Sequence, residues 1–177
     1  MLWCCGLRIG EALSLPVGDV DLAEAVITVR KAKHNRTRLV PMSQSLAAYA
    51  RRYAVAVGLI AEDPGSWFFP SPRGGCYDPG SATTHIQGLM LEAGVTTASG
   101  RAPRTHDLRH SYAVACLAKM QADGVDVYAA LPLLATFMGH ADIVSAEYYL
   151  RLDRSDWAAI EQAMADTYAG VFPQGVV

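Results

Sequence analysis

One strand pair constrains the fold of this chain more than any other feature. The segments VITVRKA (26–32) and TRLVPM (37–42) are rich in β-branched residues and flank the polar stretch KHNR (33–36), which predicts a β-hairpin with a charged tip. The other patterned segments have helical spacing, at 7–15, 43–58, from 81, 105–122, 125–138, 143–150 and 155–168. The predicted fold is therefore α+β and mainly helical, with one small antiparallel sheet at about residues 26–42.

The length of the chain limits the number of domains. With 177 residues, it can form one domain with a sizeable core but not two of average size. Residues 61–80 are rich in proline and glycine and are predicted to be a loop, with at most a short strand at WFF (67–69). The last residues, VFPQGVV (171–177), are predicted to be a loose tail.

Composition argues against several classes of protein. Apolar residues make up 51% of the chain, yet no apolar run reaches the roughly 18 residues that a membrane span requires. The opening MLWCCGLRIGEAL lacks the features of a signal peptide. The four cysteines show no C-x-x-C spacing, so neither a zinc ribbon nor a disulfide framework is indicated. We therefore expect reduced thiols and a cytoplasmic location.

Positive charge is concentrated in one segment. The formal net charge is −2, but the stretch 26–40 contains no acidic residue and carries Arg30, Lys31, Lys33, Arg36 and Arg38. A basic strip on a nearly neutral protein predicts a polyanion bound on one face.

The segment RAPRTHDLRHSYA (101–113) is the first candidate for a binding site. Thr105 is predicted to cap a helix whose first turn presents His106 and Arg109, three positions apart, near the positive end of the helix dipole. With Arg101 and Arg104 nearby, this arrangement would suit a phosphate. From this spacing alone, an ordinary capped helix with surface charges is the better interpretation.

The second candidate is GLRIGEAL (6–13). Its helical spacing places Arg8 and Glu11 on one face, where Glu11 could orient Arg8. Taken alone, such a pair is more often a solvated surface ion pair than a functional site.

The order of the motifs changes this assessment. GLRIGEAL is followed by a lysine on the hairpin before LVPM, then HDLRH (106–110), then Gly139-His140, then a tyrosine nine residues after His140. This ordered set resembles the catalytic domain of the tyrosine recombinase, or phage integrase, family over residues 6 to about 152. The resemblance implies that fold for residues 1–170, followed by the tail at 171–177. It also implies that the domain is truncated at its N-terminus and that the family's separate core-binding domain is absent.

The resemblance also implies roles for individual residues. Arg8 and Arg109 match the two arginines that clamp the nonbridging oxygens of a scissile phosphate, and Glu11 matches the acid that supports the first of them. Tyr149 matches the nucleophile, so its neighbour Tyr148 is expected to pack elsewhere. The remaining catalytic matches are the histidines of H-x-x-R and Gly-His and the hairpin lysine that protonates the leaving 5′ oxygen: His106, His140 and Lys33. By composition Arg30 or Lys31 could replace Lys33, which only its register against LVPM favours.

Six further basic residues are predicted to bind DNA in such a protein. They are Arg30, Lys31, Arg36, Arg38, Arg101 and Arg104. The partner would be double-stranded DNA, bound by a homo-tetramer that is a monomer without DNA, with no role for a membrane.

The implied activity is site-specific DNA recombination or integration through a 3′-phosphotyrosyl intermediate. Guanidinium groups stabilise the charge of the transition state, and the covalent link conserves the energy of the broken bond. No cofactor and no metal are therefore expected. The expected setting is a cytoplasmic, nucleoid-associated enzyme of a prokaryotic or phage mobile element.

Three alternatives remain at this level. One is a catalytically silent, DNA-binding remnant of a mobile-element integrase. Another is a zinc hydrolase, because HDLRH places His106 and His110 at the spacing of a zinc-binding helix. The third is a type IB topoisomerase, which shares the fold and the tyrosine chemistry.

Overall fold

A computed structural model describes residues 1–32, 36–59, 63 and 65–139. The first compact unit runs from Met1 to Tyr112, and the second begins at Ala113, within the helix α5 (Thr105–Ala122). The helices predicted at 143–150 and 155–168, and the predicted tail, lie outside the described residues.

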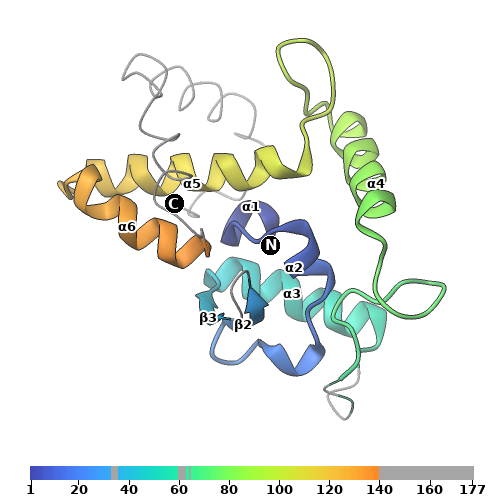
Figure 1. The fold of residues 1–177 in the computed structure, drawn as a ribbon. Coiled ribbons are helices and arrows are strands. Elements are labelled where there is room, and N and C mark those ends of the chain that lie inside the picture. Colours follow the sequence, from blue (N-terminus) through green and yellow to red (C-terminus); the bar gives the residue numbers. More distant parts are fainter. Residues whose placement is uncertain (33–35, 60–62, 64, 140–177) are drawn as a thin grey trace. The chain divides into compact units, whose positions relative to one another are not determined.

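The first unit combines short helices, a small sheet and two longer helices (Figure 1). In chain order its elements are α1 (Leu2–Cys5), α2 (Ile9–Leu13), the 3-10 turn η1 (Val17–Asp19), β1 (Val20–Asp21), β2 (Val26–Ala32), β3 (Arg36–Pro41), α3 (Gln44–Val57), α4 (Pro79–Glu92) and the first half of α5. The prediction of a mainly helical α+β fold with one antiparallel sheet is confirmed for the described part of the chain.

The sheet has the strand order β1-β2-β3 and is antiparallel throughout. Ile27 pairs with Val40, and both side chains are fully buried, so one face of the hairpin belongs to the core. The hairpin prediction is thus confirmed, while its turn at residues 33–35 lies outside the described residues. The strand β1 was not predicted, because two residues are too few to show an alternating pattern.

Polar caps define the ends of the longer helices. Ser43 accepts a hydrogen bond from the backbone N–H of Leu46 at the start of α3, and Gly58 ends that helix with a φ of 67°. The helix predicted at 43–58 is therefore confirmed. The helix α4 begins at Pro79, slightly before the predicted start, because Asp78 caps it through the N–H of Ser81.

Backbone hydrogen bonds join the loop that precedes α4 to the segment just after α2. The N–H of Phe68 donates to the carbonyl oxygen of Leu15 over 2.7 Å, and the N–H of Val17 donates to that of Ser66 over 2.7 Å. Phe68 is 2% exposed and lies 5.7 Å from the ring of Tyr53. The strand suggested at 67–69 is reduced to one isolated bridge between Pro16 and Trp67.

In the second unit, the described residues form the latter half of α5 and the helix α6 (Val127–Met138). Asp126 caps α6 by accepting a hydrogen bond from the N–H of Tyr128, and Gly139 ends it. The apolar side of α6 is buried, including Leu131, Leu134 and Met138. The helices predicted at 105–122 and 125–138 are both confirmed. Within the described part of the chain, no helix combines the length and hydrophobicity that crossing a membrane requires.

Gly6 forms the connection between α1 and α2. Its φ of 59° lies in the left-handed region, and a Cβ atom built on it would lie 2.5 Å from Cδ1 of Tyr112. Two independent constraints therefore favour glycine at this position. Gly10, inside α2, has no such constraint, since a Cβ there would meet no atom within 4 Å.

We expect Gly6→Ala to lower the free energy of unfolding by about 2–3 kcal/mol, because backbone strain and displacement of Tyr112 add together. The matched control, Gly10→Ala, should be neutral or stabilise by up to about 1 kcal/mol, because alanine favours helix over glycine. Urea denaturation followed by circular dichroism measures both. Equal effects of the two substitutions would contradict the close approach of Tyr112.

Candidate active site

The first part of the candidate site is built at the start of α2. Glu11, in the first turn, accepts a hydrogen bond from the backbone N–H of Arg8 over 2.9 Å, which satisfies one of the donors that a helix start leaves open. The other oxygen of Glu11 accepts from Nη1 of Arg8, also over 2.9 Å. Glu11 thus contacts both the backbone and the side chain of Arg8, which is the contact that the predicted orienting role requires.

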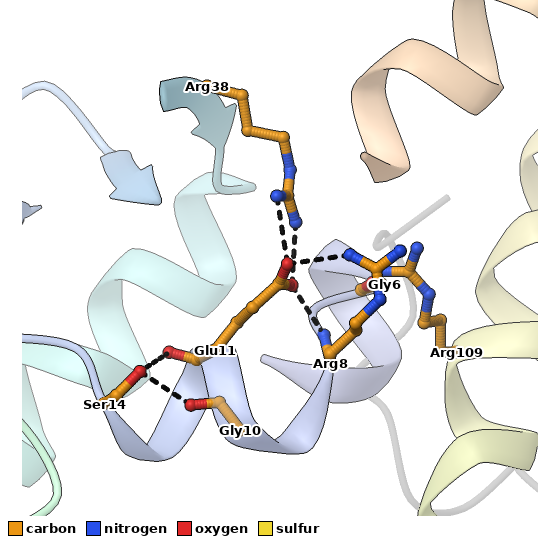
Figure 2. Close-up of polar contacts among 7 residues, drawn as sticks. All are labelled: Gly6, Arg8, Gly10, Glu11, Ser14, Arg38 and Arg109. Carbon is orange, nitrogen blue, oxygen red and sulfur yellow. Dashed lines mark hydrogen bonds and ion pairs between the residues drawn. The ribbon is translucent and has the colours of Figure 1, made fainter. Parts of the chain in front are cut away.

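A second arginine reaches the same carboxylate from the sheet. Nη1 and Nη2 of Arg38, on β3, lie 3.1 and 2.8 Å from Oε1 and Oε2 of Glu11. Figure 2 shows Glu11 between the two guanidinium groups. The side chain of Arg38 is only 12% exposed, compared with 32% for that of Arg8. Its position in the basic strip did not reveal this inward orientation.

The two arginines determine the charge state of Glu11. Burial alone would raise the pKa of the Glu11 carboxyl, but hydrogen bonds from Arg38 and from the Arg8 backbone, together with the charges of both guanidiniums, hold that pKa below its ordinary value. Glu11 is therefore ionised at neutral pH.

The third arginine of the site comes from α5. Arg109 is 1% exposed, and its Nη1 donates a hydrogen bond to the carbonyl oxygen of Gly6. The bond connects residues 103 positions apart in the chain and ends two positions before Arg8 (Figure 2). The structure thus fixes Arg109 against the segment that carries Arg8.

His106 lies in the first turn of α5 and belongs electrostatically to the same cluster. Partial desolvation lowers the pKa of its imidazole, and the positive charges of Arg109, Arg104 and Arg8 lower it further, while Asp107 acts in the opposite direction. A histidine whose pKa lies below the ordinary value of about 6.5 is mostly neutral at pH 7. It can then accept a proton.

His110 packs edge-to-face against His106. The two ring centroids lie 4.4 Å apart with their planes at 88°. Burial lowers the pKa of His110, and the charge of His106 lowers it further. Both imidazoles of HDLRH therefore favour the neutral form.

The start of α5 differs in detail from the prediction. Thr105 is the first helical residue, and the carboxylate of Asp107 accepts a hydrogen bond from the backbone N–H of Arg104 over 2.9 Å. Asp107 also forms an ion pair with the guanidinium of Arg104, whose side chain is 77% exposed. From the sequence, Asp107 was considered only as the counterpart of the glutamate of H-E-x-x-H in the zinc alternative. Its place in the first turn, after a polar residue, is nevertheless a recognisable signal for the start of a helix.

The other basic residues predicted to bind DNA are arranged differently. Arg30 is 64% exposed, and its Nε lies 2.8 Å from an oxygen of the buried Asp19. Arg101 is exposed in the loop before α5, whereas Lys31 lies on β2 and Arg36 begins β3. The predicted residues Lys33, His140 and Tyr149, as well as Tyr148, lie outside the described residues.

The zinc alternative has no support in the described part of the chain. These residues contain no group of three or more histidine, cysteine, aspartate or glutamate side chains that could hold a metal ion. Arg109 instead places a positive charge close to both histidines of HDLRH.

The model of the phage integrase family matches residues 1–156. The chain belongs to this family.

The most similar curated proteins include a putative integrase/recombinase, y4rB, of Sinorhizobium fredii, which is 33% identical over 85% of this chain and 49% of its own length. The tyrosine recombinase XerC of Alcanivorax borkumensis is 32% identical over 98% of this chain and 50% of its own length. The chain thus spans about half the length of the curated relatives it matches.

Solved structures share the fold. The crystal structure of XerA recombinase matches with a TM-score of 0.69 at 24% identity, over 97% of this chain and 55% of that one. The Tn1549 transposon integrase, solved in complex with transposon right end DNA, matches with a TM-score of 0.64 at 18% identity, over 93% of this chain and 56% of that one.

We expect nuclear magnetic resonance titration to show both His106 and His110 titrating below the ordinary histidine pKa. Arg104→Gln should raise both pKa values, because it removes a positive charge and leaves Asp107 unpaired. Asp107→Asn is the matched variant of opposite sign and should lower both values. Shifts in the same direction for the two variants would contradict this electrostatic arrangement.

Proposed function

We propose that this chain is the catalytic part of a site-specific DNA recombinase that cleaves and rejoins DNA through a 3′-phosphotyrosyl intermediate. The observation that carries the proposal is the grouping of Arg8, Arg109 and His106, because Arg109 donates a hydrogen bond to the carbonyl oxygen of Gly6, two residues before Arg8. The charges of both arginines also lower the pKa of His106. Membership of the phage integrase family supports this reading of the group.

The chemistry of a phosphodiester explains why these residue types belong together. Attack by an oxygen nucleophile increases the negative charge on the nonbridging oxygens, and guanidinium groups remain protonated at any relevant pH. Arg8 and Arg109 would stabilise this charge. The Glu11 carboxylate neutralises only one of the two guanidiniums that contact it, so the cluster remains attractive to an anion.

The proposed reaction moves two protons and exchanges one bond. Tyr149 loses its phenolic proton to His106 and attacks phosphorus, which forms the bond from phosphorus to the tyrosine oxygen. The bond between phosphorus and the 5′ oxygen breaks, and Lys33 protonates the leaving oxygen. Rejoining is the reverse, with a 5′ hydroxyl as the nucleophile. His140 would contribute a further contact to the phosphate.

The partner proposed for the chain is double-stranded DNA. Several solved neighbours are complexes with DNA, among them the XerH recombinase bound to its difH substrate. The exposed arginines Arg30, Arg101 and Arg104 would contact the DNA backbone, together with Lys31 and Arg36. A homo-tetramer on DNA, a monomeric free state and a cytoplasmic, nucleoid-associated location are parts of the same proposal.

The domain assignment is also part of the proposal. Residues 1–170 would form the catalytic domain, and 171–177 a tail. A separate domain that grips the other side of the DNA would account for the half of the curated relatives that this chain does not match.

The test is covalent attachment to a nicked DNA duplex that traps the cleaved strand. Tyr149→Phe should abolish the adduct, which is visible as a denaturant-resistant shift in gel mobility, because phenylalanine has no oxygen nucleophile. DNA binding should be unchanged, since the substitution removes one hydroxyl group and no charge.

The matched control is the adjacent residue, because Tyr148→Phe removes the same hydroxyl one position earlier. It should leave the adduct intact. An adduct that persists in Tyr149→Phe would refute the assignment, and its loss only in Tyr148→Phe would move the nucleophile by one residue. Binding without any adduct in the wild-type chain would favour the silent remnant instead.

A further inference from the structure

Arg38 differs from the rest of the basic strip in the direction of its side chain. On β3 it pairs with Val29 and shares a face with Val40, and both valines are buried. The next residue, Leu39, is 65% exposed on the opposite face. The alternation of the strand therefore points Arg38 inward, at 12% exposure, whereas the side chain of Arg30 on β2 is 64% exposed.

The contact between Arg38 and Glu11 has the geometry of a fork. Both terminal nitrogens of Arg38 meet both oxygens of Glu11, at 3.1 and 2.8 Å, which matches the planar shape of a carboxylate. Two more hydrogen bonds reach the same carboxylate from Arg8. Rotation of the Glu11 carboxylate would break several of these bonds at once.

We propose that Arg38 is a positioning residue for strand cleavage, which holds Glu11 from the sheet so that Glu11 fixes the guanidinium of Arg8 toward the scissile phosphate. The proposal rests on the proposed function, in which Arg8 binds that phosphate. It gives Arg38 a role different from the direct DNA contact that its place in the basic strip predicts.

The charges of the three groups explain what Arg38 adds. With Arg38 present, one carboxylate is shared by two guanidiniums (Figure 2). Without Arg38, the whole charge of Glu11 would act on Arg8 and weaken the attraction of Arg8 for a phosphate. Arg38 thus fixes the direction of Arg8 and also leaves more of its positive charge available. Arg8 is the more exposed of the two, so it is the one that a phosphate reaches.

The first measurement is independent of catalysis and uses nitrogen nuclear magnetic resonance of the Arg8 guanidinium, assigned by its disappearance in Arg8→Lys. In the wild-type chain, the contact with Glu11 should hinder rotation of the Arg8 guanidinium group, so that its two Nη atoms give separate signals. Arg38→Met keeps the length of the side chain but removes its donors and charge, and it should merge the Arg8 signals. Arg38→Lys keeps the charge without the fork and should give an intermediate result.

Arg51 on α3 provides the matched control for this measurement. Its Nε and Nη2 donate to the carbonyl oxygen of Leu22, so Arg51→Met also removes a hydrogen-bonded arginine, but one outside the cluster. The Arg8 signals should not change in this variant. Arg8 signals unchanged in Arg38→Met would overturn the proposal. If Arg38→Met does not fold, as judged by urea denaturation, Arg38→Lys provides the same comparison.

The second measurement links the geometry to cleavage. Arg38→Met should slow adduct formation with nicked DNA by about 10- to 100-fold, the effect of a misdirected phosphate-binding group. In a Glu11→Gln background the same substitution should have a much smaller effect, because the two residues act through one contact. Multiplicative effects of the two substitutions would overturn the proposal.

The salt dependence of DNA binding separates positioning from direct contact. In a background of Arg8→Met and Tyr149→Phe, where Arg8 has no phosphate contact left to lose, Arg38→Met should leave the slope of log affinity against log salt unchanged. A slope reduced by about 1 would show a lost phosphate contact and would overturn the proposal. If the wild-type chain forms no adduct while its Arg8 signals respond to Arg38→Met, the proposed function fails and the positioning of Arg8 stands.

Discussion

The carboxylate of Glu11 is the group on which the arrangement of the site depends. It accepts hydrogen bonds from the backbone and side chain of Arg8 and from both terminal nitrogens of Arg38. The same carboxylate therefore caps the start of α2, connects that helix to β3 and orients the guanidinium of Arg8. A carboxylate this enclosed is stable as an anion only because guanidiniums surround it, which is consistent with its lowered pKa. The local fold and the charge pattern of the site therefore have the same cause.

The contact between Arg109 and Gly6 is the second connection that builds the site. An arginine that is 1% exposed needs a strong acceptor, and the carbonyl oxygen of Gly6 provides one. Gly6 can present this oxygen because its left-handed backbone and missing side chain allow close approach to Tyr112. One glycine thus explains both the turn before Arg8 and the anchoring of Arg109, so GLRIGEAL is a structural motif as well as a chemical one.

Much of the fold was predictable because its signals are local. The alternation at 26–42, the cap at Ser43 and the glycine at the end of α3 each depend on neighbouring residues, and the corresponding elements are present. The pairing of Glu11 with Arg8 was also predictable from their spacing, although Arg8 is the extended residue just before α2, so the contact is that of an N-cap residue with the third helical residue. The start of α5 was less predictable, because Thr105 and Asp107 both have a side-chain oxygen that can accept a hydrogen bond from an open backbone N–H. Only the structure shows that Asp107 accepts the N–H of Arg104.

By itself, the sequence determined the mainly helical α+β class, the hairpin and the resemblance to the phage integrase family, because these follow from periodicity and from motifs in a fixed order. It also determined most helix boundaries in the part of the chain that the structure describes. Only the tertiary structure decided which of the basic residues turn inward. Arg30 and Arg38 look equivalent in a charged strip, yet one is exposed beside Asp19 and the other is enclosed against Glu11. The physical reason is that the direction of a strand side chain depends on the register of the strand and on the residues that pack against the sheet. The local pattern of charge predicts neither of these.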